Sequence, residues 1–317
     1  VIDKPIVVIG QGRSGTSALL NLIAEDPRFG ALQHWETMYP VPPPETATYA
    51  SDPRIDKADR YIRHWYRLTP EMAGMHEWGG AVPQECVRAH ALAFRSIAWL
   101  NLVGQVPSYS MAMMQADMRP AYRYQKRLLQ LLQWKHPRQH WVLKSPVHLD
   151  YLPQLLDVFP DAGIVWTHRD PVRAFASVVS LIGTAQWGRC DEPFKAGSYD
   201  FVTSLEPAAR RLEQVIDWIE DGTVPRARLL SIQYRDFVND PLQAVATVYE
   251  TFGIGMPDAV RERLAAIIKA RPRSARPEHR YGTGREDELT TARRAFARYA
   301  DYFAVPSESG GDLRGLA

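Results

Sequence analysis

The chain has few of the features that mark secreted, membrane-spanning or polyanion-binding proteins. Only Cys86 and Cys190 occur among its 317 residues, too few and too isolated for a disulfide framework or a cysteine zinc site. The charges of the 38 basic and 36 acidic residues nearly cancel, which argues against nucleic acid as a partner. No apolar run approaches the roughly 20 residues of a membrane span, and the first residues do not resemble a signal peptide. We therefore expect reduced thiols, no membrane span and a cytoplasmic location.

A glycine-rich octapeptide, Gly10–Ser17, stands between an apolar run at residues 5–9 and a helix-like run at residues 16–23. A strand that turns through glycines into a helix start presents backbone N–H groups and the positive end of a helix dipole. The loop also carries four side chains that can donate to an anion: Arg13, Ser14, Thr16 and Ser17. The sequence therefore predicts a site for a phosphate or sulfate group near the N-terminus.

Two better-known phosphate loops share part of this pattern. Read as Gly-x-x-x-x-Gly-Thr-Ser, it is a nucleoside-triphosphate loop in which Thr16 replaces the lysine that reaches the β- and γ-phosphates. Read as Gly-x-Gly-x-x-Gly, it fits a dinucleotide fingerprint, with Glu36 at about the distance of a ribose-binding acid. The stretch at residues 30–35 is short, is not β-branched and leads into a proline-rich segment, so it makes a poor second dinucleotide strand. The first reading lacks its lysine and the second lacks a suitable second strand, so the sequence favours a third kind of anion-binding loop.

Two further apolar runs end in polar clusters. Residues 141–143 lead into Lys144-Ser-Pro, and residues 163–167 lead into His168-Arg169-Asp-Pro. In an open parallel α/β sheet, ligand-binding groups collect at the carboxyl ends of the strands. We predict an α/β fold with a P-loop-like open parallel sheet flanked by helices, in which three strand ends meet at one crevice.

Four motifs in this order resemble those of sulfotransferases that use 3'-phosphoadenosine 5'-phosphosulfate. They are Arg13-Ser-Gly-Thr-Ser17, Lys144-Ser-Pro, His168-Arg169-Asp-Pro with Ser177 beyond it, and Tyr234-Arg-Asp-Phe-Val-Asn-Asp-Pro241, followed by His279-Arg-Tyr-Gly. The likeness is closest to the bacterial branch related to tyrosylprotein sulfotransferases and covers almost the whole chain. It implies a sulfotransferase that needs no metal.

The resemblance also implies roles for individual residues. Sulfuryl transfer depends mostly on positioning and electrostatic stabilisation, because charge spreads over the equatorial and leaving oxygens. Lys144 would neutralise the departing phosphate oxygen. The donor would be bound by Arg13, Ser14, Gly15, Thr16 and Ser17 at its phosphosulfate end, by Arg169 and Ser177 at its 3'-phosphate, and by Tyr234 at its adenine.

A base must take the proton of the attacking hydroxyl. In the tyrosylprotein branch this base is the glutamate of a Glu-Thr pair, which Glu36-Thr37 matches here. His148 is the rival, because cytosolic members of the superfamily use a histidine shortly after the equivalent lysine. His34 and His76 are further alternatives.

We predict one domain over residues 1–317, with a helical insert on the acceptor side at about residues 49–140. Apolar residues recur at helical spacing over 83–103 and 117–133. The insert holds aromatic and methionine side chains that can form an adaptable apolar pocket: Trp65, Trp78, Phe94, Trp99, Met111, Met113, Met114 and Trp134. We thus expect sulfation of a hydroxyl on an apolar or aromatic small molecule, lipid or acyl chain. The alternatives are a P-loop-type kinase and a non-catalytic protein that binds 3'-phosphoadenosine 5'-phosphate.

Overall fold

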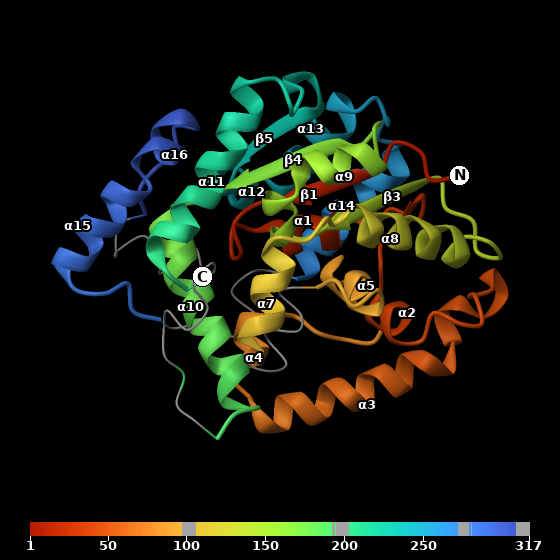
Figure 1. Cartoon of the computed structure of the whole chain (residues 1–317). Coiled ribbons are helices and arrows are strands. Elements are labelled where there is room, and N and C mark those ends of the chain that lie inside the picture. Colours follow the sequence, from red (N-terminus) through yellow and green to blue (C-terminus); the bar gives the residue numbers. More distant parts are fainter. Residues whose placement is uncertain (97–105, 192–193, 195–202, 272–278, 280, 309–317) are drawn as a thin grey trace.

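The computed structural model describes residues 1–96, 106–191, 194, 203–271, 279 and 281–308. Five parallel strands form one sheet in the order β2-β3-β1-β4-β5 (Figure 1). They are β1 (Ile6–Ile9), β2 (Phe29–Gly30), β3 (His140–Lys144), β4 (Gly163–His168) and β5 (Leu229–Gln233). Because helices flank this sheet, the predicted α/β class is confirmed.

The strands are short apolar runs because both faces of the sheet are covered. Side chains alternate along β1: Val7 and Ile9 enter one apolar core, and Ile6 and Val8 enter the other. The first core also contains side chains of α8 (Arg119–Leu132), α9 (Leu152–Val158), α11 (Leu205–Glu220), α15 (Glu286–Ala295) and α16 (Ala297–Tyr302). The second contains side chains of α1 (Thr16–Ile23), α12 (Tyr234–Asn239), α13 (Pro241–Thr251) and α14 (Asp258–Ala270).

The described part of the stretch predicted as a helical insert consists of helices joined by loops. After α2 (His34–Met38), it contains α3 (Pro53–Leu68), α4 (Met72–Met75), α5 (Val87–Leu92), α7 (Pro107–Met114) and α8, which lie below and beside the sheet in Figure 1. The predicted helix over 117–133 corresponds to α8. Only α5 represents the one over 83–103, since residues 97–103 lie outside the described part.

The connections place the glycine loop at the switch point of the sheet. From the central strand β1 the chain forms β2 and β3 on one side, and β4 and β5 lie on the other. Ligands of open α/β sheets bind where the strand order reverses in this way. The loop after β1, the end of β3 and the end of β4 therefore share one edge, as the sequence predicted.

Candidate active site

The loop after β1 turns on two glycines and leads into α1. Gly10 has a φ of 154° and Gly15 a φ of 90°, values that glycine adopts without strain. A Cβ on Gly10 would lie 2.6 Å from Oγ of Ser14, so the loop also needs glycine for its packing. Thr16 and Ser17 begin α1, where the first N–H groups have no acceptor inside the helix. The loop thus presents backbone donors and a helix dipole to an anion.

Ser14 supports this loop from behind. Its Oγ donates to the carbonyl of Gln11 at 2.6 Å and lies 2.9 Å from Oγ1 of Thr167 in β4. Its amide donates to the same carbonyl at 3.2 Å. The side chain of Ser14 therefore shapes the loop and ties it to the neighbouring strand, while its contact with a donor stays a prediction.

Tyr234 closes the other side of the glycine turn. It begins α12 directly after β5, and a Cβ on Gly15 would lie 2.9 Å from its ring. The guanidinium of Arg169 stands over the same ring, 4.5 Å from its centroid, a favourable cation–π arrangement. The fold thus brings Tyr234 and Arg169, which are distant in sequence, against the loop.

Arg13, Arg169 and Ser177 form a cluster beside this turn. Nε of Arg13 donates to Oγ of Ser177 at 3.1 Å, and Nη1 of Arg169 donates to the carbonyl of Arg13 at 3.0 Å. Ser177 lies on α10 (Pro171–Trp187), and its Oγ is also 3.1 Å from Nδ1 of His279. Burial and the charge of Arg169 lower the pKa of Arg13. Two neighbouring guanidiniums that repel one another favour an anion beside them.

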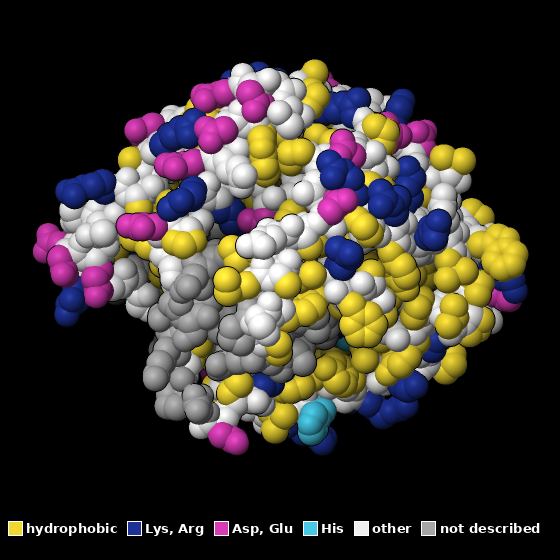
Figure 2. All heavy atoms as spheres, in the orientation of Figure 1, with side chains coloured by type: hydrophobic (Ala, Val, Ile, Leu, Met, Phe, Trp, Pro, Cys, Tyr) yellow, Lys and Arg dark blue, Asp and Glu magenta, His cyan; other side chains and the backbone are white. Residues whose placement is uncertain are grey.

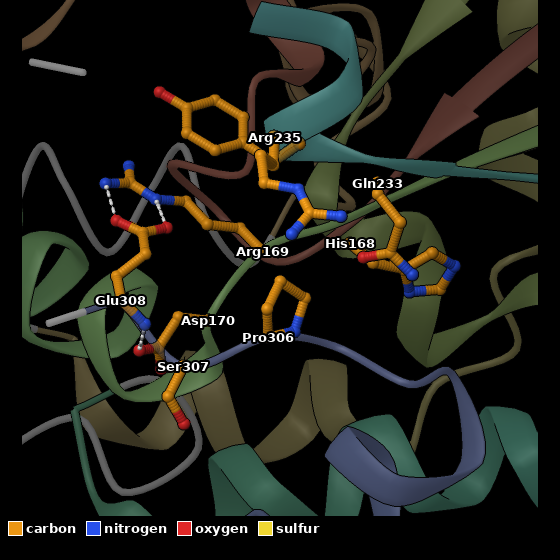
Figure 3. A pocket seen from close by; sticks show the side chains of 9 residues that line it. His168, Arg169, Asp170, Gln233, Arg235, Pro306, Ser307 and Glu308 are labelled. Carbon is orange, nitrogen blue, oxygen red and sulfur yellow. Dashed lines mark hydrogen bonds and ion pairs between the residues drawn. The ribbon is translucent and has the colours of Figure 1, made fainter. Parts of the chain in front are cut away.

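The last described residues, Pro306–Glu308, cross this cluster. The carboxylate of Glu308 accepts from Nε of Arg169 at 2.8 Å and from Nη2 at 2.9 Å, and the Glu308 amide donates to Asp170 at 2.7 Å (Figure 3). Burial lowers the pKa of Arg169, but the pairing with Glu308 outweighs this and raises it. The segment closes one side of a cavity of about 130 Å³ that His168, Gln233, Tyr234 and Arg235 also line. A carboxylate thus occupies the fork that the sequence analysis assigned to a 3'-phosphate.

Lys144 ends β3 and reaches the start of α1. Its Nζ donates to Oγ of Ser17 at 2.9 Å and pairs with Oε1 of Glu85 at 2.7 Å. Lys144 is 1% exposed, so it is not a solvated surface lysine. Glu85 was not predicted: no local pattern marks it, and it reaches the site because the amide of Cys86 donates to the carbonyl of Lys144 at 2.8 Å.

Glu36 lies in the short helix α2, where its carboxylate is fully engaged. One oxygen accepts from the amide of Gln33 at 2.9 Å, and the other accepts from the hydroxyl of Tyr49 at 3.0 Å. Burial raises the pKa of Glu36 to about 7, although both hydrogen bonds oppose the rise. Glu36 thus has a pKa suited to a base but also caps its own helix.

His148 is buried in the turn after β3. Its Nδ1 is 2.9 Å from the hydroxyl of Tyr122, while its Nε2 is buried without a partner in the described part of the chain. Burial, followed by the charges of His90 and Lys144, holds the pKa of His148 well below its usual value. His148 is therefore a neutral imidazole behind Lys144.

A sequence profile of the sulfotransferase family matches residues 5–258, from β1 to the start of α14. The chain belongs to the sulfotransferase family. The matched region contains every predicted site residue, and Glu308 and His279 lie beyond it.

Solved and curated sulfotransferases share this architecture. Sulfotransferase STF9 from Mycobacterium avium is 26% identical, with a TM-score of 0.78 over 98% of this chain and 79% of that one. STF1 from Mycobacterium tuberculosis is 27% identical, with a TM-score of 0.75 over 94% of this chain and 77% of that one. Omega-hydroxy-beta-dihydromenaquinone-9 sulfotransferase Stf3 from Mycobacterium bovis is 23% identical over 278 residues, which is 84% of this chain and 67% of that protein. The predicted likeness to bacterial sulfotransferases is confirmed, and with it the enzyme class.

The sulfotransferase has an apolar surface over its helical region. Figure 2 shows hydrophobic side chains gathered around α5, α7 and α8, while acidic side chains gather toward α11, α15 and α16. Phe94, Met111 and Met114, three of the residues predicted to form an apolar pocket, are 79%, 64% and 52% exposed. Met113 instead packs against the core, and Trp99 lies outside the described residues.

Two properties concern only the described part of the chain. It brings no three His, Cys, Asp or Glu side chains together as metal ligands, and independence from metal stays a prediction. Its helices include none both long and apolar enough to cross a bilayer.

Proposed function

We propose that this sulfotransferase moves a sulfuryl group from 3'-phosphoadenosine 5'-phosphosulfate to a hydroxyl of an apolar lipid or small molecule. The amides of Gly15, Thr16 and Ser17 hold the phosphosulfate, and Lys144 neutralises the phosphate oxygen as the sulfur–oxygen bond breaks. These roles rest on the chemistry and the placement of the residues themselves.

One observation carries the proposal: cationic side chains flank the same glycine turn on two sides. Lys144 meets Ser17 on one side, and Arg13 meets Arg169 and Ser177 on the other. The ring of Tyr234 lies against Gly15 between them. A nucleotide that carries a phosphosulfate at one end and a 3'-phosphate at the other fits this arrangement, with the base beside Tyr234. ATP and NAD lack the 3'-phosphate.

The acceptor proposal rests on the surface beside this site. The apolar face around α5 and α7 suits a hydrocarbon-rich molecule better than a sugar or a nucleotide. The name of the relative Stf3 specifies a hydroxylated dihydromenaquinone as that enzyme's acceptor. We therefore place the acceptor among hydroxylated apolar lipids and phenols.

The proposal is tested first by ligand-dependent thermal unfolding. Adenosine 3',5'-bisphosphate is expected to raise the melting temperature far more than AMP, ATP or NAD, because ligand bound only to the native state stabilises it. Arg169→Ala is expected to weaken the bisphosphate by about 1.5–3 kcal/mol and to leave AMP nearly unchanged. Equal shifts with ATP and the bisphosphate would contradict the donor assignment.

Turnover separates the enzyme from a non-catalytic nucleotide-binding protein. Radiolabelled donor is incubated with phenols and hydroxylated isoprenoid lipids, and sulfated product is measured. An enzyme transfers label to at least one acceptor. Tight bisphosphate binding without transfer to any acceptor would favour the non-catalytic alternative.

A further inference from the structure

The segment at residues 75–77 is held against the donor loop and α1. The carbonyl of Met75 accepts from Nη1 of Arg13. Oε2 of Glu77 accepts from Nδ2 of Asn21, on α1, at 3.4 Å. Because its two neighbours contact the donor loop and α1, His76 stands beside the start of this loop–helix unit.

The backbone of His76 is fixed independently of its imidazole. The hydroxyl of Tyr66, on α3, donates to the carbonyl of His76 at 3.1 Å and accepts from the amide of Trp78 at 2.9 Å. The imidazole packs edge-on against the ring of Trp78, with centroids 5.4 Å apart. Within the described part of the chain neither imidazole nitrogen makes a hydrogen bond, and the residue is only half-buried. An approaching molecule can therefore reach a free nitrogen.

Titratable groups of four elements act electrostatically on this imidazole: Lys144 of β3, Arg13 of the loop, Arg88 of α5 and His34 of α2. Burial, followed by the charges of Lys144, Arg13 and Arg88, holds the pKa of His76 well below its usual value. The imidazole is then neutral and keeps a lone pair at physiological pH.

The other predicted bases are less available. Both carboxylate oxygens of Glu36 already accept hydrogen bonds, and one of them stabilises the start of α2. His148 is fully buried, with Tyr122 at one nitrogen. Glu85, which the sequence did not predict as a base, is committed to an ion pair with Lys144. His34 is fully buried, so among the predicted bases in the described part of the chain only His76 combines a free imidazole nitrogen with partial exposure close to Arg13.

We propose that His76 is the base that removes the proton of the acceptor hydroxyl, an inference that rests on the proposed function. The acceptor oxygen forms a bond to sulfur as the bond between sulfur and the 5'-phosphate oxygen breaks. The electron pair of that bond leaves with the phosphate, whose charge Lys144 neutralises. The acceptor proton moves to a nitrogen of His76, and the resulting imidazolium returns it to solvent.

The test compares His76→Asn with wild type on two acceptors, phenol and p-nitrophenol, at mildly alkaline pH. Phenol, with a pKa of about 10, needs a base, and loss of that base is expected to lower its turnover by about 10²-fold or more. The nitrophenol is largely ionised, so the fall in its turnover is expected to be much smaller. His64→Asn, on the exposed side of α3, is the matched control and should behave as wild type. His76→Gln gives a second variant, and unchanged affinity for adenosine 3',5'-bisphosphate shows that the donor site is intact.

Each outcome is decisive. If His76→Asn keeps wild-type rates on phenol, the inference is overturned while the proposed function stands. The inference is also overturned if Glu36→Gln or His148→Asn lowers turnover of phenol much more than turnover of p-nitrophenol, and His76→Asn does not. Wild type that binds the bisphosphate but sulfates neither the phenols nor any hydroxylated isoprenoid lipid overturns the proposed function, and the role of His76 with it. If wild type sulfates only such a lipid, His76→Asn is expected to lower turnover of that lipid by the same factor, and unchanged turnover overturns the inference.

Discussion

Replacement of Glu308 by glutamine is expected to tighten binding of adenosine 3',5'-bisphosphate. The Glu308 carboxylate fills the fork of Arg169 with two hydrogen bonds, at 2.8 and 2.9 Å. If Arg169 binds the 3'-phosphate, the phosphate must first displace this carboxylate. Glutamine keeps the size of the side chain but removes its charge, so the competition weakens.

The expected magnitude follows from the burial of the pair. The side chains of Arg169 and Glu308 are only 8% and 12% exposed, so solvent screens their attraction little. Hydrogen bonds to charged groups contribute about 1.5–3 kcal/mol, and the amide oxygen of glutamine retains one of them. We therefore expect a gain of about 1.5 kcal/mol in bisphosphate binding, which is about tenfold in Kd. The ligand-free variant should be less stable than wild type, because Arg169 loses its counter-charge.

Isothermal titration calorimetry measures the affinity, and thermal unfolding without ligand measures the stability. AMP, which lacks the 3'-phosphate, should bind wild type and Glu308→Gln equally. Glu25→Gln is the matched control: Glu25 also pairs with arginines, Arg263 and Arg271, but at the far end of α1. Weaker bisphosphate binding by Glu308→Gln would refute the reasoning, since Glu308 would then assist the nucleotide.

Two further predictions concern Lys144 and Glu36. Lys144→Met is expected to lower turnover by about 10²-fold or more at saturating donor and to change bisphosphate affinity much less. The reason is that the charge of Lys144 matters most as the leaving oxygen becomes negative. Near-normal turnover would show that Lys144 does not act on the leaving group. The pKa of Glu36 is raised from 4.5 to about 7, so the stability from its protonated form is complete below about 4.5 and is lost as the pH rises through 7. The free energy of unfolding of wild type relative to Glu36→Gln should therefore fall by about 2–3 kcal/mol between about pH 5 and about pH 8 in urea titrations; a difference that does not change with pH would show that Glu36 titrates normally.

The sequence determined the parts of this protein that depend on local pattern. Apolar runs that end in polar residues predicted β1, β3 and β4, and the glycines of the loop predicted the turn into α1. Because carboxyl ends of parallel strands share one edge, the same pattern placed Ser17, Lys144 and Arg169 at one crevice. The edge strand β2, only two residues long, left no such pattern.

Contacts between distant segments were decided only by the tertiary structure. Glu308 pairs with Arg169, 139 residues away in the sequence, and Glu85 pairs with Lys144, 59 residues away. Neither carboxylate lies in a motif. The sequence offered His76 only as one histidine among several, since its free imidazole beside the donor loop depends on how α3 and α4 pack. Local periodicity records which face of an element is apolar. Which carboxylate pairs with an arginine or a lysine depends on which distant segment packs beside it, and the packing of the whole fold sets this.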